Sequence, residues 1–182
     1  PRVDAVISGG SSLDYRNKAT YPVGISQSGG VKVGYYQKSS HQIVNLNQCP
    51  VQDSRLNPIL REVKEDIQSL GWEIYNEGSH TGIIRHLGLR IGRRSGEILL
   101  TLIVKHWNIP RICEKAQEWL DHYPPLVGVM LNRNDHRTNK IFGSETRLVT
   151  GKPYLEEEFA SLKFQIRPDT FFQVITETAE AL

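Results

Sequence analysis

The sequence predicts an α+β fold in which helices pack on a mixed, mainly antiparallel sheet. Two stretches, 15–71 and 82–123, each read as a β-hairpin followed by an amphipathic helix. A third observation is the order apolar strand, helix, apolar strand from 98 to 131, which predicts a parallel pair joined by a right-handed crossover. These patterns indicate two hairpin–helix units that share one sheet.

The first unit contains three strands and one helix. The expected strands are 15–25, 31–38 and 42–46. Gly29 and Gly30 give the turn signal between the first two strands. The helix is predicted with Asp53 or Ser54 as its cap and Gly71 as its end. Its apolar stripe consists of Leu56, Ile59, Leu60, Val63, Ile67 and Leu70.

The second unit begins with an alternating strand at 82–92 and turns at 93–96. The return strand, 98–104, is apolar on both faces, which marks a central strand. Pro110 suits the first turn of the following helix, and the prolines at 124–125 stop it. The predicted buried stripe of this helix consists of Ile112, Cys113, Ala116, Trp119, Leu120 and Tyr123.

The remaining chain adds an apolar strand at 126–131, a polar and basic loop at 132–140, and strands at 141–150 and 162–166. A helix is expected to begin near Thr176. The predicted organisation is a connector arm (1–14), a central α+β domain (15–168) and the start of a following domain (169–182).

The composition indicates a globular domain, with 182 residues, 38% hydrophobic residues and 22 Lys plus Arg against 20 Asp plus Glu. Charges cluster in the arginines of 85–94 and in the acidic run 156–158, and most such clusters are solvated faces. No apolar run has the length that spans a bilayer, so we expect a soluble protein without a membrane partner. Two cysteines cannot form a disulfide framework, which suits a cytoplasmic location.

No complete set of nucleophile, base and orienting group is recognisable, and the six histidines lack ligand spacing. Each histidine is therefore interpreted as solvated or as satisfied by its neighbours. Cys113 is expected to be buried on its helix stripe. Cys49 follows a strand and precedes Pro50, a position where a thiolate could face a cluster or a substrate, although position alone favours an ordinary cysteine.

Three groups of residues suit RNA. Arg16 and Lys18 share one strand face at a spacing that fits successive phosphates, with an exposed strand face as the alternative. Lys38 lies near Tyr35 and Tyr36, whose rings suit unpaired bases, although they also suit sheet packing. Near the end, Phe171 and Gln173 could stack on a base and bind its edge; core packing is the alternative for Phe171 and Phe172.

Taken in order, these pieces resemble the RNA (uracil-5-)-methyltransferases, most closely the 23S rRNA branch. The segments that carry the resemblance are 15–19, 34–41, 43–50, 82–87, 96–97 and 171–174. In that family the corresponding region is a central domain between an N-terminal RNA-binding barrel and a C-terminal domain that binds S-adenosylmethionine. The resemblance covers essentially the whole chain.

The resemblance implies specific roles. Cys49 matches the last ligand of a 4Fe-4S cluster, whose other three cysteines would precede this region. Gln173 matches a glutamine at the S-adenosylmethionine and target-base site, and Phe171 matches the aromatic residue that accompanies base flipping. The catalytic cysteine and the general base belong to the C-terminal domain, so no catalytic residue is expected here. Ile175 departs from the pattern, because the family usually has an asparagine there.

The function predicted from the resemblance is the central domain of a 23S rRNA uracil-C5 methyltransferase that positions RNA. Its expected RNA contacts are Arg16 and Lys18, followed by Lys38 and Arg85. A tRNA uracil-5-methyltransferase is the first alternative, and a non-catalytic RNA-binding module of the same fold is the second. Neither S-adenosylmethionine nor the cluster is expected to bind this chain alone.

Overall fold

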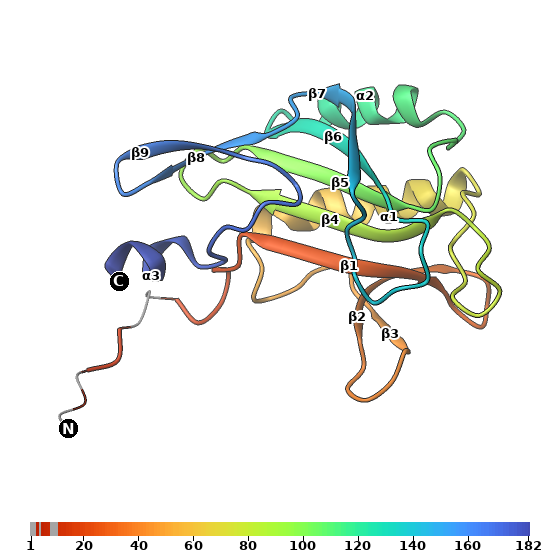
Figure 1. Ribbon diagram of the computed structural model, residues 1–182, viewed down its shortest axis with the longest axis horizontal. Helices are drawn as coiled ribbons and strands as arrows, with labels where there is room; N and C mark the ends of the chain where they lie inside the picture. Colours follow the sequence, from red (N-terminus) through yellow and green to blue (C-terminus); the bar gives the residue numbers. More distant parts are fainter. Residues whose placement is uncertain (1–2, 4, 8–10) are drawn as a thin grey trace.

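The computed structural model describes residues 3, 5–7 and 11–182, which form a seven-stranded sheet and a separate two-stranded hairpin (Figure 1). The strands are β1 (Lys18–Ile25), β2 (Val31–Tyr36), β3 (Ile43–Asn45), β4 (Ile84–Ile91), β5 (Ile98–Val104), β6 (Leu126–Arg133), β7 (Glu145–Gly151), β8 (Leu155–Phe159) and β9 (Leu162–Ile166). The helices are a 3-10 turn η1 (Ser54–Leu56), α1 (Asn57–Ser69), α2 (Ile112–His122) and α3 (Thr176–Ala181). Part of the predicted connector arm (1–2, 4 and 8–10) lies outside the described residues.

The sheet order is β3-β2-β1-β4-β5-β6-β7, and every neighbouring pair is antiparallel except β5 and β6. The parallel pair is joined through α2, as the apolar strand, helix, apolar strand pattern predicted. The two hairpin–helix units and the mixed, mainly antiparallel sheet are thus confirmed. No helix among the described residues is long and apolar enough to cross a membrane.

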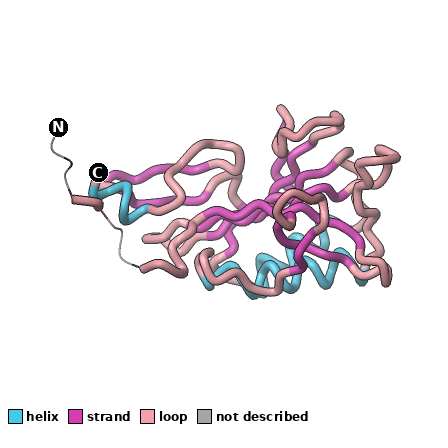
Figure 2. The backbone as a smooth tube through the Cα atoms, turned by 90° about the horizontal axis from the view of Figure 1, so that it is seen from below, coloured by secondary structure: helices cyan, strands magenta, loops and turns pink. Residues whose placement is uncertain are grey.

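Helices α1 and α2 cover one face of the sheet (Figure 2) and form the main core with it. The centre of this core is Trp119, which is fully buried and meets Trp72 edge-on with ring centroids 6.2 Å apart. Its indole Nε1 donates a hydrogen bond of 2.7 Å to the carboxylate of Asp66 on α1. Trp119 therefore joins both helices as well as filling the core.

The opposite face of the sheet is covered in part by the β8–β9 hairpin and by the loop between β6 and β7. Leu99 and Met130 pack there against Leu155 and Ile166 of the hairpin, with Phe172 alongside. From the β6–β7 loop, the ring of Phe142 lies 5.4 Å from the ammonium nitrogen of Lys18. This contact places the β6–β7 loop over the start of β1.

The first helix begins differently from the prediction. Asp53 caps η1, its side chain accepting a 3.1 Å hydrogen bond from the Arg55 backbone, and α1 follows with Pro58 in its first turn. Gly71 then ends the helical segment with φ of 63°, a left-handed conformation that glycine adopts without strain.

Two expectations about the elements are wrong. Cys113 is exposed, because the buried face of α2 consists of Ile112, Ala116 and Trp119 and position 113 points away from it. The acidic run 156–158 belongs to strand β8, where alternate side chains are buried and Glu157 faces inward. Three consecutive glutamates have little β-propensity, so only their tertiary partners make this strand.

Candidate nucleic-acid interface

The start of β1 brings Lys18 next to the segment 167–173. Lys18 lies opposite Arg90 in the β1–β4 ladder. Burial and the charge of Arg90 together lower the pKa of Lys18 to about 8, although Asp169 opposes the change. The backbone carbonyl of Lys18 accepts a 2.9 Å hydrogen bond from Arg16 Nε. Asn17, which lies between these two cations in the chain, hydrogen-bonds to Gln173 and Val174, so the backbone of both predicted phosphate contacts lies beside the segment of the predicted base contacts.

Arg90 is the residue that anchors the segment 167–170. Its guanidinium donates 2.7 Å hydrogen bonds to the carbonyl oxygens of Arg167 and Thr170, and a longer one of 3.3 Å to the Thr170 hydroxyl. The side chain is buried, which lowers the pKa of Arg90 to about 10. A buried cation with three oxygen partners fixes the backbone just before Phe171.

Asn17 holds the same segment on its other side. Its side-chain nitrogen donates to the carbonyl oxygen of Gln173 (2.8 Å) and to the hydroxyl of Thr176 (3.0 Å), and its backbone N–H donates to Val174. Between Arg90 and Asn17, the side chain of Phe171 is 85% exposed, and that of Gln173 is also exposed. The segment is fixed at both ends, with two predicted base-contacting side chains directed to solvent.

The aromatic residue next to Phe171 has the opposite placement. Phe172 packs with Phe159 and Phe164, with ring centroids 5.6 and 6.2 Å from its own. The expectation that at least one of Phe171 and Phe172 belongs to a core is thus confirmed for Phe172. Phe171 is left exposed beside Gln173.

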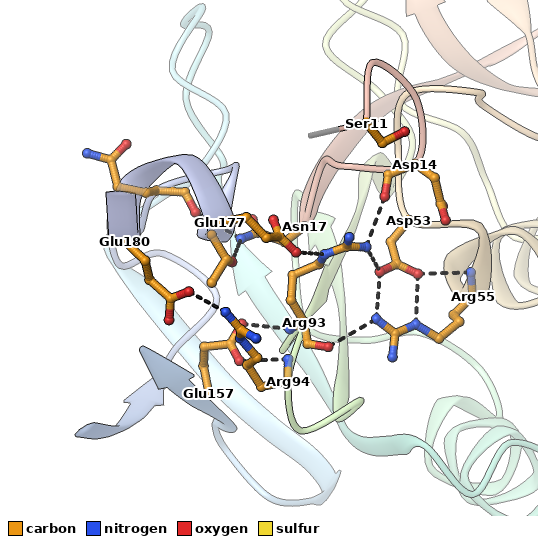
Figure 3. Close-up of polar contacts among 12 residues, drawn as sticks. Ser11, Asp14, Asn17, Asp53, Arg55, Arg93, Arg94, Glu157, Glu177 and Glu180 are labelled. Carbon is orange, nitrogen blue, oxygen red and sulfur yellow. Dashed lines mark hydrogen bonds and ion pairs between the residues drawn. The ribbon is translucent and has the colours of Figure 1, made fainter. Parts of the chain in front are cut away.

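A network of charged residues joins α3 to the sheet (Figure 3). Arg93, in the β4–β5 turn, contacts Asp53 with one guanidinium nitrogen and Glu177 of α3 with Nε at 3.1 Å. Arg94 in the same turn pairs with Glu180, also on α3. We call Asp53, Arg93, Arg94, Glu177 and Glu180 the α3 network.

Asp53 is the buried centre of the α3 network. Burial alone would raise the pKa of Asp53, but hydrogen bonds from Arg55 and Arg93 outweigh it and lower the pKa below its ordinary value. Glu157 of β8 supports the same turn, because its carboxylate accepts the backbone N–H groups of Arg93 (2.6 Å) and Arg94 (3.0 Å). These contacts fix the direction in which α3 leaves the sheet.

Lys38 and Arg85 lie away from this group. Lys38 is exposed in the turn between β2 and β3. Arg85 is only 5% exposed and lies six residues before the end of β4, where it donates to the carbonyl oxygens of Asn134 (2.5 Å) and His136 (2.8 Å). These bonds give Arg85 a structural role in the β6–β7 loop, and its contact with RNA stays a prediction.

Cys49 is 6% exposed, in contrast to the accessible position suggested by its polar neighbours in sequence. Burial raises the pKa of Tyr21 and Tyr35, and the nearby Cys49 raises the pKa of both further. The part of the chain that the structure describes contains no group of three or more His, Cys, Asp or Glu residues placed to hold a metal ion. One thiol does not fit a 4Fe-4S cluster, so the remaining ligands would have to come from other residues.

Asn17 and Arg90 are the positioning residues that the sequence did not reveal. Arg90 stood in an alternating strand, where a charged residue normally faces solvent. Its apolar surroundings on β4 and β5 were a signal of burial, but its partners are backbone carbonyl groups, which no sequence pattern marks.

No protein-family model matches the chain. It is 68% identical over all 182 residues to an uncharacterized RNA methyltransferase of Nostoc sp., and 51% identical over 180 residues to one of Synechocystis sp.. It covers 40% and 39% of these relatives, so the chain spans about two fifths of the length of the curated relatives it matches.

Among solved structures, the fold is similar to that of the Pyrococcus abyssi tRNA (uracil-54, C5)-methyltransferase in complex with S-adenosyl-L-homocysteine. The TM-score is 0.77 at 20% identity, and the match covers 97% of this chain and 40% of the other. This likeness shows a shared fold. Over its whole length the chain is thus homologous to one segment of proteins described as RNA methyltransferases.

Proposed function

We propose that this chain is the central module of an S-adenosylmethionine-dependent enzyme that methylates C5 of uridine in 23S rRNA. The observation that carries the proposal is that the backbone bearing the cations Arg16 and Lys18 is hydrogen-bonded, through Asn17, to the anchored segment that bears the exposed Phe171 and Gln173. Support comes from the RNA methyltransferases that match the full chain, and from a fold neighbour that acts on uracil C5 in tRNA and binds S-adenosyl-L-homocysteine.

In this proposal the described residues bind and orient RNA and perform no bond-making step. Arg16 and Lys18 neutralise phosphates, which adds affinity without sequence preference. Phe171 stacks on an unpaired base, and the amide of Gln173 offers both a donor and an acceptor to its edge. S-adenosylmethionine, when bound, supplies the methyl group. Gln173 is the one residue of this chain that we assign to its site, and a single exposed amide does not form such a site alone.

We propose ribosomal RNA as the substrate because the chain resembles the 23S rRNA branch. Transfer RNA is the second candidate substrate because the fold neighbour acts on it. Mapping 5-methyluridine in cellular RNA, with and without the full-length gene, separates the two. We expect one 23S rRNA uridine to lose its methyl group in the deletion strain. Loss from tRNA alone would move the assignment to the alternative, and no loss anywhere would favour a non-catalytic RNA-binding module.

The double substitution Arg16→Ala and Lys18→Ala in the full-length protein should weaken RNA binding and flatten its salt dependence. If each side chain contacts one phosphate, the slope of log K against log salt falls by about 1.4 for single-stranded RNA. Equilibrium binding at four salt concentrations measures the slope. Arg61→Ala, which removes an exposed cation from α1 on the helix-covered face, should leave the slope unchanged. Equal slopes for the double variant and the wild type would remove both residues from the interface.

RNA affinity should also depend on pH through Lys18. Its pKa of about 8 means that the ammonium group is largely charged at pH 7 and loses its charge as pH rises towards 9. We expect affinity to fall above about pH 8, and the fall to be absent in Lys18→Arg, because arginine stays charged. The unfolded chain holds this proton more tightly, so folding stability changes in the opposite direction and rises with pH above 8. A pH-independent affinity in the wild type would contradict the phosphate contact.

Cys49 provides a separate test of the cluster ligand. In the full-length protein, Cys49→Ser should abolish the visible absorbance of a 4Fe-4S cluster, because serine does not replace a thiolate ligand. The exposed Cys113 supplies a matched control, and Cys113→Ser should leave the spectrum unchanged. If Cys49→Ser retains the full absorbance, then Cys49 is an ordinary buried cysteine.

A further inference from the structure

Two pockets lie on the other half of β4, away from Arg90. They have volumes of about 290 and 300 Å³, which is near the lower end of the range for small-molecule sites. Tyr75, Glu77 and Arg85 line both of them. The first pocket is completed by Tyr36 and His86, among others, and the second includes Arg137. The three shared residues make the two pockets one composite site.

Two buried polar atoms in the walls of this site lack partners. Among the described residues, nothing accepts a hydrogen bond from Arg85 Nε or pairs with His86 Nδ1. Burial and the charge of Arg85 lower the pKa of His86 to about 4, so its ring is neutral at pH 7, with one donor and one acceptor nitrogen. Unpartnered buried polar atoms are rare because they cost stability, and here both lie beneath the surface of the site, whose floor is therefore polar.

The walls also offer aromatic surface and a carboxylate. The Arg85 guanidinium carbon lies 4.3 Å from the ring centroid of Tyr75, and Tyr36 is 42% exposed where it lines the first pocket. Glu77 reaches this pocket from the loop before β4, and its carboxylate lies 3.3 Å from the ring of His41. Flat rings, a cation and a carboxylate together suit a nucleotide: the rings contact the base, the cation contacts a phosphate, and the carboxylate accepts hydrogen bonds from the base edge.

We propose that this composite pocket binds one unpaired RNA nucleotide and prefers guanosine to uridine. The preference comes from Glu77. Ionised carboxylates only accept hydrogen bonds, and guanine presents two adjacent donors, N1–H and the N2 amino group, whereas uracil presents one. Arg85 and Arg137 supply positive charge for the phosphate. The inference rests on the proposed function in one respect, that the ligand is RNA, and it adds a second base contact beyond Phe171 and Gln173.

The test compares the binding of two RNA pentamers, UUGUU and UUUUU, to the full-length protein by fluorescence anisotropy at one salt concentration. We expect UUGUU to bind at least tenfold more tightly. Glu77→Gln should reduce this preference to less than threefold, because an amide offers the base one acceptor group in place of two. Tyr36→Ala should weaken binding of UUGUU about tenfold through lost stacking, while Tyr36→Phe retains it.

Glu73→Gln is the matched control, since Glu73 is an exposed carboxylate four residues earlier and lines neither pocket. Equal affinity for the two pentamers, no detectable binding of either, or a preference that survives Glu77→Gln would each overturn the proposal. Uridine methylation, measured on the same preparations, distinguishes a failure of the proposed pocket from a failure of the proposed enzyme function. Methylation without a guanosine preference rejects only the pocket, and a Glu77-dependent preference without methylation rejects only the proposed enzyme.

Discussion

Replacing Trp119 with Ala is expected to lower the free energy of unfolding by about 3 to 5 kcal/mol. The side chain is fully buried between α2 and the sheet, so its removal leaves a cavity that the surrounding backbone cannot close. The substitution also takes away the edge-on contact with Trp72 and the hydrogen bond to Asp66, whose carboxylate then keeps only its ion pair with Lys115 as a contact to α2. Because a domain is stable by about 5 to 15 kcal/mol, this change removes a large share of the total.

Urea denaturation followed by far-ultraviolet circular dichroism measures the loss. Trp119→Phe separates the two contributions, because it keeps most of the ring packing and removes only the Nε1 donor. We expect it to cost about 1.5 to 3 kcal/mol, the usual range for one hydrogen bond to a charged group. If Trp119→Ala changes stability by less than about 1 kcal/mol, then α2 is not held to the core as the structure shows.

Replacing Arg90 with Met should reduce RNA methylation by the full-length enzyme about a hundredfold. Methionine fills a similar volume but leaves the carbonyl oxygens of Arg167 and Thr170 without their donor, so the backbone before Phe171 is released. Displacement of a positioning segment by about 1 Å costs enzymes on the order of a hundredfold in rate. The accompanying loss of folding stability is expected to be about 2 to 3 kcal/mol, less than the loss for Trp119→Ala.

Hydrogen exchange provides a measurement that does not depend on the proposed activity. In Arg90→Met the amides of 169–173 should exchange faster, while those of β5 keep their protection. Arg61→Met serves as the control, since it replaces an exposed arginine on α1 by the same residue. Unchanged exchange in 169–173 would show that Arg90 does not anchor the segment, whatever happens to methylation.

The sequence predicts the central strands and the order of the elements because burial determines the spacing of their apolar residues. Strand β5 has the limits that the sequence predicts, since its seven successive residues, six of them apolar, are buried on both faces. Strand β8 was missed because its Glu157 is satisfied by backbone N–H groups of a turn more than sixty residues earlier in the chain. Cys113 lies at the margin of the apolar stripe of α2, and helical spacing alone does not decide whether a residue at the margin is buried or exposed.

In the candidate site, too, local sequence patterns predict the exposed residues and do not predict the tertiary contacts that support them. Arg16, Lys18, Phe171 and Gln173 were named from the sequence, and the structure brings the two pairs into one region although about 150 residues separate them. Their supports, Arg90 and Asn17, act through backbone oxygens, and this kind of contact depends on tertiary structure that local residue patterns do not encode. The burial of Arg85 likewise depends on the β6–β7 loop, whose carbonyl groups it contacts.

The α3 network reduces the conformational entropy that this segment loses when a base binds. Phe171 and Gln173 lie on a short segment fixed before it by Arg90 and after it by Asn17 and the ion pairs of α3. A base-contacting loop that is free in solution loses conformational freedom when its ligand binds, at about 0.5 to 1.5 kcal/mol for each immobilised side chain and more for the backbone. Here the backbone ordering is already complete in the folded chain. A nucleotide that binds here therefore orders little more than the exposed side chains of Phe171 and Gln173.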